Sequence, residues 1–443
     1  MSALFSSFPK TSKEEWVDLL QKELKGASPD TLQKFNRIEE ISLPSYFHRE
    51  DAPAAFSDPG LAPFTRGTQR ENNDWLIGTC FRIGTPKETN AELLDALMKG
   101  TTSLVLHATN KAAIDFDQLL AEIGLEFIQT TFYPQTEEQA LAFIAKAGTF
   151  PSSIVFPRSV SWLKSAAAAT KDLAVKPFAV NAFAVQQVGA TTWQELAIAL
   201  AEGHEYLVEQ LELGLTVDEA AANIHFVLGT GNKYFYEISK FRAFRTAWSR
   251  IVAEYEPQHT CSQAAYITAK TGFMYVSIKD PYTNLLRQTT EAMSAVIGGA
   301  NALVIQPFDW YSLKPNVTFS RRMATNISLL LKEESYLSNV IDPAGGSYAL
   351  DSLTNAITER AWAGFQEIER NGGLDSIPVK LQLSEEIKAK VEQRMTLFNE
   401  KKETLIGINT FPNPQTVDNE WHNVPTGWNN LPLLIVETQI QQA

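Results

Sequence analysis

Short apolar runs alternate with helix-like segments along the chain from Trp75 to about residue 308. The runs are rich in β-branched and aromatic residues, as buried parallel strands are, and the segments between them repeat their apolar residues every three or four positions. Eight successive strand–helix units predict an α/β fold of the closed (β/α)8 type, a TIM barrel. The strand-like runs cover residues 75–83, 102–108, 126–133, 152–157, 177–183, 224–230, 264–270 and 301–308.

An open, doubly wound sheet is the other architecture that alternating strands and helices can form. Such sheets normally carry several glycines in the first turn between a strand and its helix. The first such turn here, residues 82–89, reads RIGTPKET and holds a single glycine. The pattern therefore favours the barrel.

The regions on either side of the barrel pattern lack the alternation. Residues 1–62 begin with a short amphipathic helical pattern and continue as a polar, extended run, so we expect an N-terminal helical arm that lies over another surface. Residues 63–375 form the predicted barrel domain. Residues 376–443 predict a C-terminal helical extension and a tail dotted with Trp and Pro.

Composition and charge narrow the classes of partner. With 44% hydrophobic and 20% charged residues, the chain has the balance of a globular protein. Its formal net charge of −13 disfavours nucleic acid and anionic membrane surfaces, because both repel an acidic protein. No stretch approaches the roughly 20 apolar residues of a membrane span, and the N-terminus has no apolar leader core. We therefore expect a soluble, cytoplasmic protein.

The two cysteines carry no sign of a metal site. Cys80 and Cys261 match no zinc-binding spacing, and so few thiols in 443 residues suggest a reducing compartment. Each is expected to be a small buried side chain and not a nucleophile.

Catalytic groups of a TIM barrel lie where the strands end and the loops to the helices begin. These positions offer no paired carboxylates, no Ser/His/Asp set and no cluster of metal ligands. His107 could serve as a general acid or a hydrogen-bond donor, although a lone histidine at a strand end is more often structural. The strand-end residues are Arg82, His107, Tyr133, Arg158, Phe183, Ala184, Thr230, Asn232, Lys270, Gln306 and Asp309.

Two further stretches carry candidate contacts. Lys240, Arg242, Arg245 and Arg250 lie on one predicted helix, where they form either a contact for a phosphate or an acidic partner, or a solvated face with paired charges. The DPAGGSY run at residues 342–348 lacks the Lys and Ser/Thr of a phosphate-binding loop, so we expect a tight turn there.

Four stretches together resemble the methylmalonyl-CoA mutase family. Residues 279–303, KDPYTNLLRQTTEAMSAVIGGANAL, are similar to its QDPxNNxxRTxxEAxAAxxGGxQSL, and residues 333–362 are similar to its EESxxxxVxDPxGGSYxVExLTxxxxxxAW. Residues 237–245, EISKFRAFR, resemble EIAKLRAxR, and residues 185–207 resemble MQEAGATxxQELAxTLADGxEYx. Each match is weak alone, but the combination is specific and extends over most of the predicted barrel.

The resemblance implies a TIM barrel that encloses an acyl-CoA, with adenosylcobalamin held against the barrel's top by a separate flavodoxin-like domain. It implies the interconversion of methylmalonyl-CoA and succinyl-CoA by a radical rearrangement in which the cofactor performs the hard step. The family's cobalamin motif DxHxxG has only the broken counterpart EWHNVP at residues 420–425, in a tail too short for a domain of about 100 residues. We therefore expect no cobalamin-binding domain and no cobalamin held by this chain alone.

The resemblance also locates the family's substrate-facing residues on this sequence. Catalytic chains read GYHMQEAGA where this chain reads AFAVQQVGA, so the family's tyrosine and its donor histidine fall on Phe183 and Ala184. A methyl group donates no hydrogen bond to a thioester carbonyl, so we expect no catalytic residue here. What remains is a vestigial substrate pocket of Phe183, Ala184, Gln186, Asn301 and His107.

These features resemble the small, non-catalytic subunits of the family, whose opening FPxxxxxEWxxLxxKxLKG is similar to residues 8–26. We therefore expect a chain that is inactive alone, scaffolds a catalytic large subunit in a heterodimer, and depends on that partner for adenosylcobalamin. A homodimer in the partner's absence stays open. So do three alternatives: the acyl-CoA-binding barrel half of a split cobalamin enzyme, an unrelated TIM-barrel enzyme that uses His107 and Lys270, and a chaperone-like structural protein.

Overall fold

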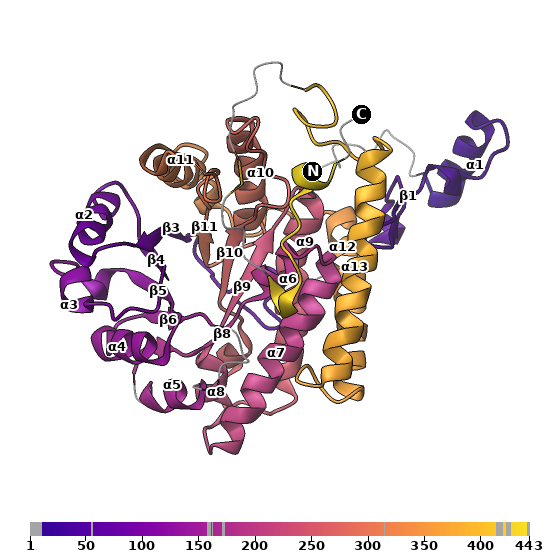
Figure 1. Cartoon of the computed structure of the whole chain (residues 1–443). Helices are drawn as coiled ribbons and strands as arrows, with labels where there is room; N and C mark the ends of the chain where they lie inside the picture. The colour runs from indigo at the N-terminus through magenta and orange to yellow at the C-terminus, as the bar shows by residue number, and fades with distance from the viewer. Residues whose placement is uncertain are drawn as a thin grey trace, which may run out of the picture.

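The computed structural model describes residues 11–54, 56–156, 161, 163–170, 173–313, 315–412, 420–421 and 427–440. A barrel of parallel strands lies at its centre, wrapped by helices (Figure 1). The barrel strands are β3 (Leu76–Ile83), β4 (Ser103–Ala108), β5 (Gln129–Tyr133), β6 (Ser152–Ile154), β7 (Val175–Lys176), β8 (Phe178–Val180), β9 (Ile224–Thr230), β10 (Ile267–Thr271) and β11 (Ala302–Val304).

The ring of strands closes through one strand that is broken in two. Neighbouring strands follow the order β7-β6-β5-β4-β3-β11-β10-β9-β8, and every pair is parallel. Pro177 separates β7 from β8, because proline has no backbone N–H to give to a neighbouring strand. β7 pairs with β6 and β8 pairs with β9, so the two pieces complete the ring. The predicted (β/α)8 barrel is confirmed.

The predicted strands are found in place, but some of their ends differ. Leu125–Phe127 form a 3-10 helix instead of the start of β5, and Phe127 is left 82% exposed. After β8 the chain turns at once into the short helix α6 (Ala182–Gln187). Phe183 and Ala184 therefore lie on the first turn of a helix and not on a strand.

Helices cover the outside of the barrel and bury their apolar stripes against it. Side chains alternate along each strand, so Ile77 and Phe81 face the helices whereas Cys80 faces the lumen. The helices of this layer are α2 (Pro86–Leu97), α3 (Phe116–Leu119), α4 (Glu137–Ala147), α5 (Leu163–Ala169), α7 (Thr192–Glu212), α8 (Val217–Ala222), α9 (Tyr234–Ala253), α10 (Thr283–Ile297) and α11 (Val317–Leu329). None of the described helices combines the length and the apolar character needed to cross a lipid bilayer.

Side chains fill the lumen, as they do in other TIM barrels. Cys80, Val105 and Val304 belong to one packed group, and Val155 and Val227 belong to a second. Cys80 is fully buried, as expected. Cys261 is exposed, so the expectation of a buried thiol is wrong there, because Cys261 sits in the loop between α9 and β10.

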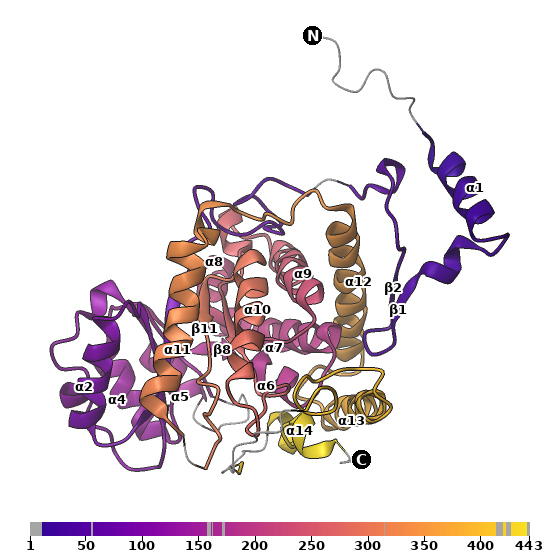
Figure 2. The same ribbon diagram turned by 90° about the horizontal axis from the view of Figure 1, so that it is seen from above.

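The two ends of the chain lie outside the barrel. The N-terminal arm consists of α1 (Lys13–Glu23) and a hairpin of β1 (Lys34–Asn36) and β2 (Ile41–Leu43). Figure 2 shows α1 projecting away from the barrel, and α1 buries none of its residues. The C-terminal extension consists of α12 (Tyr348–Arg370), α13 (Ile377–Asn399) and α14 (Val436–Gln439).

The lysine of α9 lies in the core. One interpretation of the sequence placed it on a solvated helix face, and that interpretation is wrong. Lys240 is completely buried and forms ion pairs with Glu195 of α7 (2.9 Å) and Glu237 (2.5 Å). It also donates to the carbonyl oxygen of Gly229 at the end of β9 (2.6 Å). Burial alone would lower the pKa of Lys240, but the two carboxylates more than reverse this and raise it.

Arg242 and Arg245 are buried too, because α12 packs over the outer side of α9. Arg242 bonds Asp351 (2.8 Å) and Asp342 (3.2 Å). Asp342 begins the DPAGGSY stretch, which forms the expected turn. Arg245 donates to the carbonyl oxygen of Gly298 (2.8 Å) at the end of α10. All four basic residues of α9 are described by the structure, and Arg250 is the one that is exposed.

We predict that Arg242→Ala destabilises the protein by about 3–5 kcal/mol, because it takes the cation away from the buried Asp351 and leaves Asp342 with Arg66 alone. The matched control is Arg250→Ala on the same helix, which removes a single stacking contact with Trp362 and should cost under about 1 kcal/mol. Denaturant unfolding of the full chain measures both values. Equal losses in the two variants would contradict the role of Arg242.

Candidate functional site: the mouth of the barrel

The strand-end residues of β3, β4 and β5 lie side by side at the mouth of the lumen. In the strand register Arg82 is opposite His107, and His107 is opposite Tyr133. All three side chains point inward, because they follow the alternation set by Cys80 and Val105. Three of the strand-end residues named from the sequence are thus brought together.

Aromatic contacts join these residues to others from across the lumen. The rings of His107 and Tyr133 are stacked with centroids 4.2 Å apart, and the Trp310 ring meets His107 edge-on at 5.6 Å. The Lys270 Nζ atom at the end of β10 lies 4.9 Å from the ring centre of Tyr133 and 4.8 Å from that of Phe183. We call this group, together with Arg82, the mouth cluster.

Arg82 is held at the edge of the mouth cluster by Trp310. Its guanidinium lies 4.2 Å from the ring centre of Trp310 and donates to the backbone carbonyl of the same residue (2.6 Å). Burial lowers the pKa of Arg82, and Tyr311 and Cys80 oppose that shift. Arg82 is therefore a positive charge in a fixed position, and part of its guanidinium is already hydrogen-bonded to Trp310.

The mouth cluster favours a neutral imidazole. Burial lowers the pKa of His107 to well below its usual 6.5, and the positive charges of Lys270 and Arg82 lower it further. Burial likewise lowers the pKa of Lys270 and raises that of Tyr133. Among the described residues, the Nε2 atom of His107 is buried without a hydrogen-bond partner.

The residues of the predicted vestigial pocket are only partly brought together. Phe183 contacts Lys270 in the mouth cluster with His107, and Ala184 follows it on α6 and is partly exposed. Gln186 turns instead toward the end of β9, where its side chain fills the space beside Gly229. Asn301 lies at the opposite end of the barrel, where its Oδ1 atom accepts from the backbone N–H of Ile267 at the start of β10 (2.9 Å).

The remaining strand-end residues have structural partners or face solvent. Thr230 donates to the carbonyl of Lys270 (3.2 Å), and Asp309 accepts from the backbone N–H of Asn316 (2.7 Å). Gln306 is buried and Asn232 is exposed. Arg158 lies outside the described residues.

The chain's own aromatic side chains cover the β10 and β11 side of the mouth. Phe273, Trp310 and Val276 pack there with Trp421 from the C-terminal tail. The Trp421 indole N–H donates to Glu437 (3.1 Å). The Glu437 carboxylate in turn accepts from the backbone N–H of Ile278 (3.0 Å), so the tail is fastened to the loop after β10. The sequence showed only a Trp-dotted tail, and this cover was not predicted.

Trp310 and Trp421 of the tail already occupy one side of the mouth. In the part of the chain that the structure describes, no group of three or more His, Cys, Asp or Glu side chains could hold a metal ion. Of the EWHNVP stretch, Glu420 and Trp421 are described and tied to the barrel, through the bond from the Leu313 N–H to the Glu420 carbonyl (2.8 Å). His422 lies outside the described residues.

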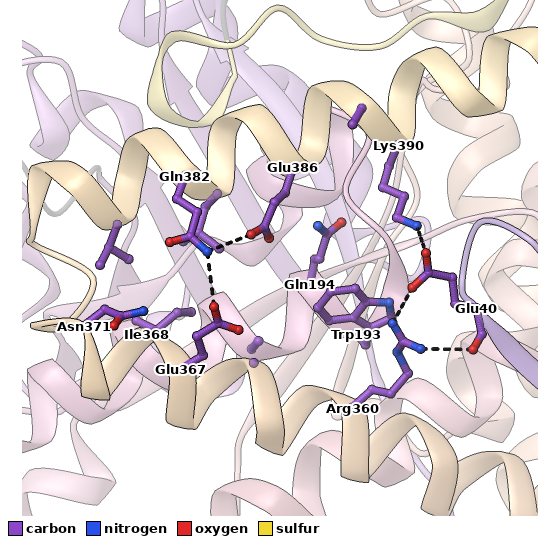
Figure 3. Close-up of a pocket in the computed structure, with 15 residues that line it drawn as sticks. Glu40, Trp193, Gln194, Arg360, Glu367, Ile368, Asn371, Gln382, Glu386 and Lys390 are labelled. Carbon is purple, nitrogen blue, oxygen red and sulfur yellow. Dashed lines mark hydrogen bonds and ion pairs between the residues drawn. The ribbon is translucent and has the colours of Figure 1, made fainter.

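A separate groove of about 330 Å³ lies outside the barrel, between α7, α12 and α13 (Figure 3). Its polar rim is already paired: Glu40 of the arm binds Arg360 (2.6 Å) and Lys390 (2.5 Å). Gln382 donates to Glu386 (2.9 Å) farther along. The groove therefore anchors the hairpin of the arm and offers no acid, base or nucleophile free for catalysis.

The fold and the mouth together define a TIM-barrel protein whose described strand ends carry aromatic rings and cations but no paired acid and base. The sequence profile described as Methylmalonyl-CoA mutase matches residues 36–126 and 158–429. The chain belongs to this family. The prediction from the four sequence stretches is confirmed.

Relatives with established names extend the match over most of the chain. The chain is 33% identical to the methylmalonyl-CoA mutase small subunit of Porphyromonas gingivalis, over 93% of this chain and 71% of that protein. It is 28% identical to the small subunit of Propionibacterium freudenreichii subsp. shermanii, over 93% and 70%. It is 29% identical to a methylmalonyl-CoA mutase of Cereibacter sphaeroides, over 90% of this chain and 64% of that protein.

We predict that His107 stays neutral in the folded protein at pH values below 6.5. The folded state then binds fewer protons than the unfolded state, so the free energy of unfolding falls as the pH drops below 6.5. His107→Phe keeps the ring stack but removes the titrating nitrogens, and its stability should depend less on pH in that window. Imidazole NMR titration reports the protonation directly, and a normal titration of His107 near pH 6.5 would contradict the buried, neutral ring.

Proposed function

We propose that this chain is the small, non-catalytic subunit of a heteromeric, adenosylcobalamin-dependent methylmalonyl-CoA mutase, and that it scaffolds the catalytic large subunit. One observation carries the proposal: Phe183 and Ala184 occupy the first turn of α6 at the mouth, where the catalytic chains of the family carry a tyrosine and a histidine. A benzyl group and a methyl group offer no hydrogen bond to a thioester.

The missing donor matters because catalysis in such a site depends on groups aimed at the reacting carbonyl. The loss of one such donor typically removes about 3 to 4 kcal/mol of transition-state stabilisation. His107 does not replace it, because its ring is stacked on Tyr133 and meets the Trp310 ring edge-on. The proposal therefore assigns methylmalonyl-CoA and succinyl-CoA isomerisation to the complex, and not to this chain alone.

The cofactor belongs to the partner in this proposal. Adenosylcobalamin supplies the radical that the family's rearrangement needs, and the covered mouth of this barrel supports its binding by the catalytic chain. In the cytoplasm, the partner would be a large subunit with an intact acyl site and cobalamin domain. The names of the small-subunit relatives support such a partner.

The scaffold role has support in surfaces that the chain leaves uncovered. α1 buries none of its residues, and Leu19 on that helix is 56% exposed. Phe35 of the hairpin is 58% exposed. Apolar side chains on a projecting arm are typical of a surface that a second chain covers, whether the catalytic partner or, in its absence, another copy.

A second candidate is the barrel half of a split cobalamin enzyme, in which this chain supplies the acyl-CoA site. The polar residues of the mouth cluster, His107 and Lys270, favour it. In that case an isolated cobalamin-binding protein would restore turnover without a second barrel.

We predict that the tagged chain, purified from its native cells, brings with it a chain carrying intact GYHMQEAGA and DxHxxG stretches. The complex should convert methylmalonyl-CoA to succinyl-CoA when adenosylcobalamin is added, and the separated small chain should show no turnover. In the matched variant Ala184→His the complex should still turn over and the separated chain should still be inactive, because a single restored hydrogen-bond donor does not rebuild the substrate site. Turnover by the native chain alone would refute the proposal.

A further inference from the structure

Lys270 is a buried lysine without a counter-ion among the described residues. The residue is 3% exposed, and its ammonium lies against the ring faces of Tyr133 and Phe183. Within the described residues the structure records no hydrogen bond or ion pair to its ammonium. The contrast with Lys240 is direct, because that equally buried lysine meets two carboxylates.

Ring faces alone are weak compensation for the hydration that a buried ammonium loses. Burying a charge normally requires a partner, as Arg242 has in Asp342 and Asp351. Lys270 differs from Arg242 and lies at a strand end, at the mouth of a TIM barrel, which is where ligands of this fold bind.

A second, independent observation points to a ligand at the same place. The His107 Nε2 atom is buried and has no partner among the described residues. Arg82 adds a further positive charge in the same layer of the lumen. The mouth cluster thus combines cations and an unused ring nitrogen, and none of its members is an acid.

The rim of the mouth cluster reaches solvent, although the Lys270 side chain itself is almost fully buried. His107, Tyr133, Phe183 and Ala184 each keep part of their surface accessible, although they line the end of the lumen. The tail and Trp310 cover the other side of the mouth. A small molecule can therefore reach the mouth cluster from the β4, β5 and α6 side, whereas the covered side limits its size.

We propose that the mouth cluster binds a small carboxylate anion, with the Lys270 ammonium as its counter-ion. A flat carboxylate group suits a cluster of ring faces with few donors, whereas a phosphate needs more hydrogen bonds than the cluster provides. The proposal stands apart from the function proposed above, because it concerns a ligand of this chain without its partner. The chain would thus keep a ligand site in a barrel that has lost its chemistry.

Calorimetric titration of the full chain, at constant ionic strength and without a partner, tests the site. The probes are acetate, malonate and succinate, with acetamide as the uncharged control and with chloride and phosphate as other anions. At least one carboxylate should bind saturably, and acetamide should not bind. Lys270→Met, which keeps the length and the ring contacts, should weaken that binding at least about tenfold.

The matched control is Lys99→Met, which removes an exposed lysine on the outside of the barrel and should leave carboxylate binding unchanged. Denaturant unfolding confirms that both variants fold, and methionine suits an aromatic surrounding at position 270. Three results would overturn the proposal: no carboxylate binds, chloride or phosphate binds equally well, or Lys270→Met binds as tightly as the native chain. None of these results depends on mutase activity. A failure of carboxylate binding would therefore not contradict the proposed role as a small subunit, which the co-purification experiment tests.

Discussion

The buried charges of α9 hold the helices of this barrel in their places. Lys240 reaches to the end of β9 and to Glu195 of α7, and Arg242 reaches outward to α12. Arg245 binds the carbonyl that ends α10. A charge removed from water is stable only while its partners stay within reach, so these contacts fix four elements relative to one helix. They also account for the EISKFRAFR stretch, whose charged residues are structural in this chain.

The same network extends to the mouth of the barrel. The carbonyl of Gly229 accepts from Lys240, and a side chain at this position would collide with Gln186, whose Oε1 atom would lie 2.7 Å from an added Cβ. Gln186 belongs to α6, which carries Phe183 and Ala184. The backbone of the family's site is therefore supported from behind while its side chains have changed. A scaffold can keep its shape when its reactive groups are replaced, because different residues carry the two tasks.

Much of the barrel could be read from the sequence, since buried strands are short, apolar and separated by helical periods. The residues of the mouth were predictable as a list, because His107 and Lys270 lie at strand ends, Phe183 follows β8 on α6, and parallel strands end at one side. Their contacts with Tyr133 were not predictable, because they depend on how far the strands tilt and stagger around the ring. The cover by Trp421 joins segments more than one hundred residues apart, and no local pattern marks such a pairing.

The sequence alone determined the order of strands and helices and the absence of a donor at Ala184, because periodicity and side-chain identity are local properties. The tertiary structure alone decided that Lys240 and Arg242 are buried and that Asn301 lies at the far end of the barrel from His107. It also decided that Lys270 has no ionic partner among the described residues. Burial and pairing depend on which surfaces other segments cover, and the cost of removing a charge from water appears only when the whole core is assembled.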